Sequence, residues 1–319
     1  MKSDDVCIAL VERGQFLRTA VGAERAGELR TTYEFTHALY RDALYRRLPT
    51  SSRITYHRRL AHGLERLRTA DHDDVAGTVA AHYEAAGVYD RAVTNTIVAA
   101  GNALRRYAHA EALALLTHAR ELNQQTSDPE TGAREFELLQ RRGDVEYARG
   151  EMALAADAYD EAAAAAVRAD VPAAAAQVLI RAARSAAFFD VPRALDACDR
   201  AAQVAIDGGL TPLEARATLV RLCWTLLHRG WSRELADTAT AALETLVQSN
   251  ADLTPADHIL FANVQVFRAE YGDATARADA ALSRLDPTDS VWEHLGALAA
   301  KGGALALRGR LGEAYRTLT

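Results

Sequence analysis

Residues suited to a close crossing of two helices, most of them small, recur along this chain. The residues at equivalent positions of successive copies are 155, 194, 235, 276 and 314, so the copies are separated by 39, 41, 41 and 38 residues. Tightly packed antiparallel helices need short side chains where their backbones cross and large side chains beside the crossing. The recurrence therefore predicts an all-α solenoid of stacked helical hairpins, in which each repeat packs on its neighbours.

The best-formed copy of the repeat lies in residues 141–167. Gly143 and Gly150 stand where the first helix approaches the second, Ala155 and Ala162 face them, and Tyr159 is placed to fill the space between the helices. This spacing is typical of tetratricopeptide-like repeats, so we expect a right-handed superhelix. Because the observed steps exceed the minimal unit of about 34 residues, we expect longer helices than the minimal unit has.

Two more closely spaced hairpins are expected before this copy. Ala80 and Ala92 mark the first, and Ala112 follows Ala92 by only 20 residues, so one helix near 89–107 is expected to serve both. The polar segment 124–132, which contains a proline, is the clearest linker. We divide the chain into a partial winged-helix-like segment (1–70), a junction of compressed repeats (73–123) and a solenoid with a truncated last repeat (133–319).

The composition favours long helices in a reducing compartment. Apolar residues make up 49% of the chain but aromatic residues only 7%, because much of the apolar share is alanine, the best helix former. The three cysteines are odd in number and far apart, which predicts buried thiols rather than disulfides. No apolar run has the length of a signal peptide or a membrane span. We expect a cytoplasmic protein without a membrane partner.

Residues 1–70 follow a different pattern. Residues 4–13 predict a short helix, and residues 16–19 and 32–35 predict two strands that pair around a loop at 22–27. A helix over 37–48 should end at Pro49, and a second helix, capped by Ser51 or Ser52, should continue to about residue 67. The order helix, β-hairpin, helix matches the second half of a winged-helix unit.

The run RGQFLR…YEFTHALYRDALYRRLPTSSRITYHRRLAHGLE resembles a segment of bacterial STAND-type regulatory ATPases, which include the large LuxR-type transcriptional activators. The motif F-x-H-A-L-x-R-x-A-L-Y carries the resemblance, and the order of the segments supports it. The resemblance implies a winged helix followed by a tetratricopeptide-like arm that regulates an ATPase. It also implies that a histidine at the position of His37 approaches the nucleotide diphosphate.

The chain departs from this family in one decisive respect. The phosphate-binding pattern G-x-x-x-x-G-K-[ST] is absent, and the lysines are limited to Lys2 and Lys301. Without that loop and its lysine we expect no nucleotide and no other cofactor. We interpret His37 as a residue that packs at a helix start, and the chain as a fragment or shortened relative. A separate ATPase or regulator chain is then a candidate partner.

The segment 30–68 is strongly basic. It contains nine arginines and three acidic residues, a net charge of +6, in a chain whose net charge is −6. Arginine and tyrosine interleave over 41–59, as in surfaces that contact nucleic-acid phosphates. A solvated helix face, or a face that packs on another domain, is the alternative. We rank nucleic-acid binding below protein or ligand binding. The candidate contacts are Arg46, Arg47, Arg58 and Arg59.

Our main functional prediction is a non-catalytic scaffold. Its concave groove, lined by the first helix of each repeat, should bind a protein segment or a small regulatory ligand. We also expect an apolar face on the last repeat, formed by Leu305, Leu311, Tyr315 and Leu318, through which copies self-associate. The position in the repeat selects the following partner-binding candidates: Arg142, Glu146, Arg181, Arg184, Arg221 and His228.

No residue pattern in the sequence predicts an enzyme. The motifs His-x-x-x-His and G-x-S-x-G and the glycine-rich dinucleotide fingerprint are absent. We interpret the acidic cluster 71–74 as a loop before a helix rather than a metal site. Cys198 and Cys223 fall at internal repeat positions and are expected to be small buried residues. We therefore predict no catalytic, cofactor or metal site.

Overall fold

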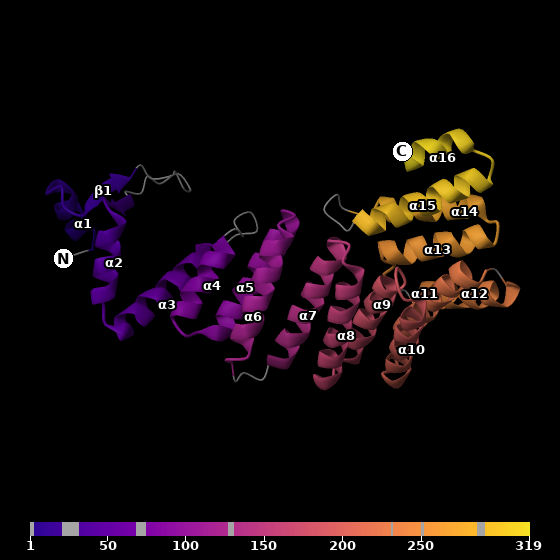
Figure 1. Ribbon diagram of the computed structural model, residues 1–319, viewed down its shortest axis with the longest axis horizontal. Coiled ribbons are helices and arrows are strands. Elements are labelled where there is room, and N and C mark those ends of the chain that lie inside the picture. The colour runs from indigo at the N-terminus through magenta and orange to yellow at the C-terminus, as the bar shows by residue number, and fades with distance from the viewer. Residues whose placement is uncertain are drawn as a thin grey trace.

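The computed structural model describes residues 3–20, 32–67, 75–126, 131–230, 232–249, 252–285 and 291–319. In this part of the chain, sixteen helices and one two-stranded sheet are formed. The predicted all-α solenoid of helical hairpins is confirmed (Figure 1). The acidic cluster 71–74 and the predicted loop 22–27 lie outside the described residues. Within the described ranges, no helix is both long and apolar enough to span a bilayer.

The N-terminal segment contains the predicted β-hairpin. Strands β1 and β2 are antiparallel, and Arg18 stands opposite Glu34, to which it forms an ion pair of 3.0 Å. The Nδ1 atom of His37 accepts a hydrogen bond of 3.2 Å from the Leu39 amide, so His37 caps the following helix. The elements are α1 (Ser3–Glu12), β1 (Leu17–Ala20), β2 (Thr32–Phe35), α2 (Ala38–Arg47) and α3 (Thr50–Leu67).

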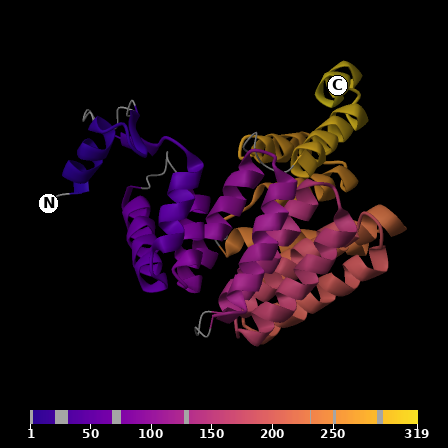
Figure 2. The ribbon, with the colours of Figure 1, turned by 60° about the vertical axis from the view of Figure 1, so that its left-hand side comes forward.

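Helices α2 and α3 have different surroundings. Helix α2 has no buried residue, and its Leu39 and Leu44 are 68% and 50% exposed. Helix α3 packs on α4 and contributes Ala61 to a core cluster with Val79 and Tyr83. The third helix of the N-terminal segment is therefore continuous with the solenoid, whereas α1, the hairpin and α2 project from its end (Figure 2).

The solenoid follows directly along the chain. Helix α5 packs on both α4 and α6, which confirms the helix predicted to serve two hairpins. Its helices are α4 (Ala76–Ala85), α5 (Tyr89–Arg105), α6 (His109–Asn123), α7 (Thr131–Ala148), α8 (Met152–Arg168), α9 (Pro172–Ala186), α10 (Val191–Asp207), α11 (Thr211–Arg229), α12 (Arg233–Gln248), α13 (Pro255–Phe267), α14 (Tyr271–Leu282), α15 (Val291–Leu307) and α16 (Leu311–Leu318).

The close crossing predicted at Gly143 is present, and Gly302 makes an equivalent crossing in the last repeat. The crossing predicted at Gly150 is wrong, because Gly150 lies in the α7–α8 turn with a φ of 79° and the atoms nearest to a Cβ there belong to Trp292 of α15. A Cβ atom on Gly143 would lie 2.5 Å from the ring of Tyr159, and a Cβ atom on Gly302 would lie 2.7 Å from Leu318. In both hairpins the two residues are sixteen positions apart, so the same steric rule operates in the first and the last regular repeat. Tyr159 is 2% exposed and packs in the core between α7 and α8.

The predicted register is wrong in the fourth regular repeat. Ala276 is exposed, whereas Ala274, Ala278 and Ala281 of α14 are fully buried. The crossing residue is therefore Ala274, and the steps become 39, 41, 39 and 40 residues. The alanine-rich sequence of α14 hides the register, because alanine occupies inward and outward positions alike. On the last repeat Leu305 is 3% exposed, so it belongs to the core and not to the predicted apolar face.

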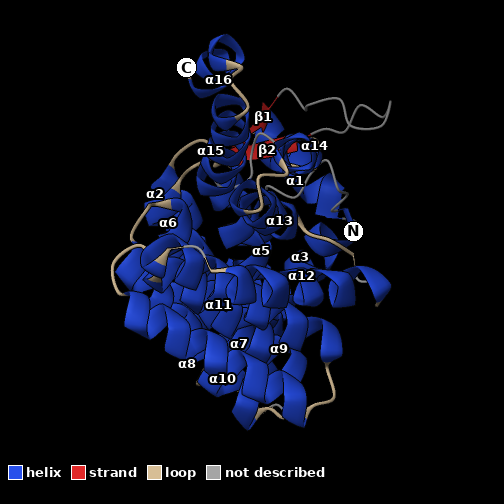
Figure 3. Cartoon of the chain, turned by 90° about the vertical axis from the view of Figure 1, so that its right-hand side faces the viewer, coloured by secondary structure: helices blue, strands red, loops and turns tan. Residues whose placement is uncertain are grey.

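Two large clusters of buried residues run along the interior of the solenoid. One runs from α3 to α7 and the other from α7 to α13, so α7 contributes to both. The hairpins from α7 to α12 lie side by side, and α13 to α16 stack beside them (Figures 1 and 3). Contacts among α9, α11, α13 and α15 show that the first helices of the hairpins form one layer.

Candidate functional site

A cavity of about 800 Å³ lies against the layer formed by the first helices. Its walls come from α7, α9, α11, α13 and α15, with additional residues from the α5–α6 turn and from α8. On α9 the lining residues are Gln177, Ile180, Arg181 and Arg184. These are spaced as neighbours on one helical face, which is how an amphipathic helix presents a continuous wall.

Arg181 belongs to a hydrogen-bonded network on one wall of the cavity. Its guanidinium group donates to the Asp144 carboxylate, and the Tyr159 hydroxyl donates to the same Asp144 oxygen at 2.7 Å. Burial, followed by the charge of Asp144, raises the pKa of Tyr159 well above its usual value. Burial lowers the pKa of Arg181, but the charges of Asp144 and Tyr159 and the hydrogen bonds to both together outweigh it, and the pKa is raised. Both groups therefore stay protonated at neutral pH.

Arg184 connects α9 to a helix far along the chain. Its Nη2 atom donates to Glu293 Oε1 of α15 at 3.0 Å, across a sequence separation of 109 residues. Burial lowers the pKa of Arg184, but Tyr147 and Glu293 outweigh this effect and the pKa is raised. Burial also raises the pKa of Tyr147, and Arg184 only partly opposes that rise. Arg184 is therefore a permanent cation beside an uncharged phenol.

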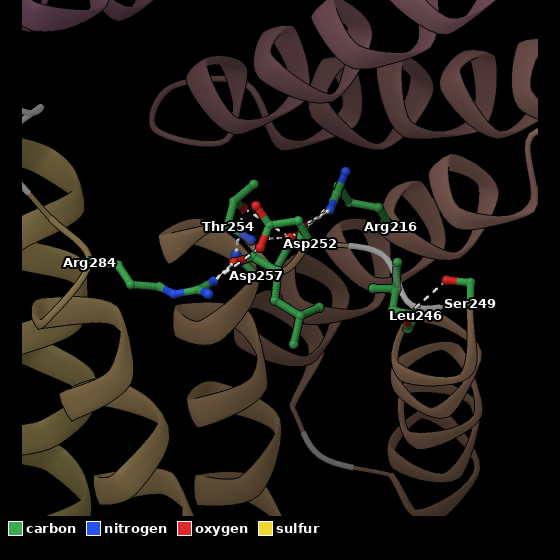
Figure 4. Close-up of polar contacts among 8 residues, drawn as sticks. Arg216, Leu246, Ser249, Asp252, Thr254, Asp257 and Arg284 are labelled. Atoms are coloured by element: carbon green, nitrogen blue, oxygen red, sulfur yellow. Dashed lines mark hydrogen bonds and ion pairs between the residues drawn. The ribbon is translucent and has the colours of Figure 1, made fainter.

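A third arginine, Arg216 of α11, fixes the start of α13. It donates to both oxygens of Asp257, at 2.8 and 2.7 Å, and Asp257 is only 1% exposed. Asp257 also accepts from the amide and hydroxyl of Thr254, which completes a capping box at the helix start. Arg284 donates to the Leu253 carbonyl in the same segment (Figure 4). The cavity wall at this end is therefore rigidly positioned.

The α15 start closes the cavity toward α9 and the α7–α8 turn. Trp292 lies 3.1 Å from the position that a Cβ atom on Gly150 would take, and its ring centroid is 5.7 Å from that of Phe188. In a solenoid, repeats contact their neighbours along the chain. The contacts of Trp292, together with the Arg184–Glu293 ion pair, join repeats that are not neighbours. We call the Trp292–Gly150 contact and the Arg184–Glu293 ion pair the rim contacts.

The structure brings together two of the six predicted partner-binding residues, Arg181 and Arg184. Glu146 is only 5% exposed and pairs with Arg149 at 2.7 Å, so it is not a surface residue as predicted. Arg142 lies 3.9 Å from Glu161, outside the cavity lining. The remaining two predicted residues are also outside the lining: Arg221 pairs with Asp199 at 2.6 Å, and His228 is exposed near Trp224.

The lining residues that were not predicted include a third arginine and the partners of the cavity arginines. They include Asp144, Tyr147, Arg216, Asp257 and Glu293. Glu293 carried no sequence signal, because its partner lies more than a hundred residues away. Asp257 did carry one, since Thr254 and Asp257 have the spacing of a capping box.

The basic segment of α2 and α3 is accessible. Arg46, Arg47, Arg58 and Arg59 are all exposed, and none forms an ion pair or hydrogen bond with any residue that the structure describes. Tyr40 and Tyr56 are 43% and 48% exposed on the same helices.

The chemistry of the cavity is that of charged and phenolic hydrogen-bond donors. Burial raises the pKa of Cys198 and of Cys223 to about 12, so neither thiol is a nucleophile at neutral pH. Among the described residues, no group of three or more His, Cys, Asp or Glu side chains is arranged to hold a metal ion.

No protein-family model matches the chain, and the comparison with curated proteins finds no match either.

Proposed function

We propose that the chain is a non-catalytic scaffold that senses a small regulatory ligand or binds a protein partner. In this proposal it is the tetratricopeptide-like arm of a STAND-like signalling or transcription regulator in the bacterial cytoplasm. One observation carries the proposal. The first helices of five consecutive hairpins converge on one cavity of about 800 Å³, a volume within the range of small-molecule sites.

The polar groups of the cavity support binding rather than proton transfer. The pKa values of Tyr147 and Tyr159 are raised, and those of Arg181 and Arg184 are raised as well, so these four side chains serve as fixed hydrogen-bond donors. The sequence resemblance adds a separate ATPase or regulator chain as a candidate partner. The exposed Leu311 and Tyr315 of α16 support self-association as an additional property, which sedimentation at high protein concentration tests.

A thermal-shift screen of the whole chain against a metabolite library tests the proposal. A ligand that binds the folded state raises the melting temperature with concentration. The double substitution R181Q/R184Q removes two cavity cations and should abolish the shift. R229Q/R233Q is the matched control, because these two arginines are exposed and lie outside the cavity lining. Ligands whose shifts survive R181Q/R184Q unchanged would place the functional site elsewhere.

A second function, nucleic-acid binding, is favoured by one specific observation. Four arginines of α2 and α3, at positions 46, 47, 58 and 59, are exposed and form no ion pair with the described residues. In this alternative, phosphates bind Arg46, Arg47, Arg58 and Arg59, and aromatic stacking on Tyr40 and Tyr56 adds to affinity. The test is DNA mobility at several salt concentrations with the four arginines replaced by glutamine. Binding that is insensitive to salt or to the substitutions would exclude it.

A further inference from the structure

The charged residues of the cavity do not balance. Its lining contains four arginines, at 105, 181, 184 and 216, but only three carboxylates, so it carries one excess positive charge with histidine neutral. The chain as a whole has a net charge of −6. The cavity is therefore a locally positive compartment in an acidic protein, and its field favours an anion.

The cavity also has more hydrogen-bond donors available to a ligand than acceptors. Asp257 accepts four hydrogen bonds, from Arg216 and Thr254, and one oxygen of Asp144 accepts two. By contrast, Arg181 and Arg184 each donate to one carboxylate and also interact with one phenol, Tyr159 or Tyr147. These partners occupy only part of the five N–H groups that each guanidinium fork carries. Two neighbouring forks on one helix face suit an oxyanion, which they bind in a planar, bidentate manner.

The shape of the cavity limits the length of its ligand. Residues of the α5–α6 turn and of the α15 start line the same cavity, and the rim contacts join α15 to α9 and to the α7–α8 turn. An extended peptide that followed the groove would have to displace the rim contacts. A compact ligand fits without such displacement, and Ile180, Val220 and Leu260 give its body an apolar wall.

We propose that the cavity binds a compact organic anion, with its oxyanion group on Arg181 and Arg184 and its apolar body against α11 and α13. The inference rests on the proposed function of the cavity as a ligand site, and it names the class of ligand. Carboxylates and phosphate esters share the oxyanion chemistry, and the experiment distinguishes them.

The experiment is isothermal titration of the whole chain with three probes that share one aromatic body. These are 2-naphthoate, 2-naphthyl phosphate and the neutral 2-naphthalenemethanol. We expect the anions to bind at least about tenfold more tightly than the alcohol, since charge-assisted hydrogen bonds are stronger than neutral ones. The tighter of the two anions identifies the natural oxyanion group. A blocked, extended acidic peptide is the fourth probe and should bind more weakly than either anion.

Two variants move the anion affinity in opposite directions. R181Q/R184Q should weaken anion binding at least about tenfold, with little effect on the alcohol, whereas R229Q/R233Q should leave all four affinities unchanged. D144N/E293Q removes two competing carboxylates and should strengthen anion binding, so the inference is tested even if R181Q/R184Q does not fold. Equal binding of anion and alcohol, tighter binding of the peptide, or no response to D144N/E293Q would each overturn the inference. The thermal-shift screen with the metabolite library tests separately whether the cavity binds any ligand, so failure of the anion proposal can be told apart from failure of the proposed function.

Discussion

Substitution of Gly143 by alanine tests the physical basis of the repeat. The added Cβ atom would lie 2.5, 2.7 and 2.9 Å from three ring atoms of Tyr159. That ring is 2% exposed, and its hydroxyl is held by Asp144 at 2.7 Å, so it has no open space to enter. The ring or the crossing of α7 and α8 must therefore shift.

The magnitude follows from three contributions. Overpacking a core costs about 1–3 kcal/mol, and loss of the Tyr159–Asp144 hydrogen bond adds about 0.5–1.5 kcal/mol. Alanine in a helix interior is more favourable than glycine by about 1 kcal/mol, which offsets part of this loss of stability. The steric term is the largest, so we expect G143A to lower the free energy of unfolding by about 2 kcal/mol.

Gly302 and Gly303 of α15 provide matched controls for Gly143 of α7. A Cβ atom on Gly303 meets no atom within 4 Å, so G303A should stabilise the protein by about 0.5–1 kcal/mol through helix propensity alone. A Cβ atom on Gly302 meets Leu318, which is 59% exposed and flexible, so G302A should be close to neutral. Urea denaturation followed by circular dichroism gives the three values, and hydrogen exchange should localise the loss in G143A to α7 and α8.

The reasoning would be refuted if G143A were as stable as G303A. The double substitution G143A/Y159A provides a second check, because a small residue at 159 removes the clash. In the Y159A background, G143A should become stabilising by about 1 kcal/mol, the helix-propensity gain alone.

Two further predictions follow from the pKa shifts. Burial, and then the charge of His57, lower the pKa of His82, so the unfolded chain binds a proton more readily than the folded chain. We expect the free energy of unfolding to fall as the pH drops below about 6.5, and H82Q to reduce this dependence in urea denaturation at several pH values. Because burial raises the pKa of Cys198 and Cys223 to about 12, we expect only the partly exposed Cys7 to react rapidly with a disulfide reagent in the native protein. Rapid reaction of all three thiols without denaturant would contradict their burial.

The sequence predicted the architecture at positions where the size of a side chain shows which face of the helix contacts its neighbour. Gly143 and Tyr159 have opposite sizes, so their spacing alone determined which faces meet, and the contact is present. In α14 nearly every candidate is alanine, and the crossing residue was placed at Ala276 instead of Ala274. The helical hairpin was predictable there, but its register was not, because small residues on both faces carry no information about burial.

The lining residues were predicted incompletely because the same repeat position does not face the cavity in every hairpin. The lining residues of α7 are 144, 147 and 148, those of α9 run from 177 to 184, and those of α11 are 216 and 220. Gly143, Ala182 and Cys223 occupy equivalent positions in α7, α9 and α11. Counted from these residues, the lining moves toward the start of the first helix with each repeat. Fixed repeat positions therefore identified the lining on α9 and missed it on α7 and α11.

The rim contacts explain why the cavity itself could not be predicted from the spacing of the repeats in the sequence. Each hairpin packs on its neighbour through local rules, and small rotations accumulate along the solenoid. Closure occurs where that accumulated rotation brings Glu293 to Arg184 and Trp292 to Gly150, residues that share no local pattern. A groove open along its length would accept a chain, whereas a groove bridged by its own later repeat favours a compact ligand. The distinction between a peptide-binding and a small-molecule-binding solenoid therefore depends on the superhelix, which the sequence of one repeat does not encode.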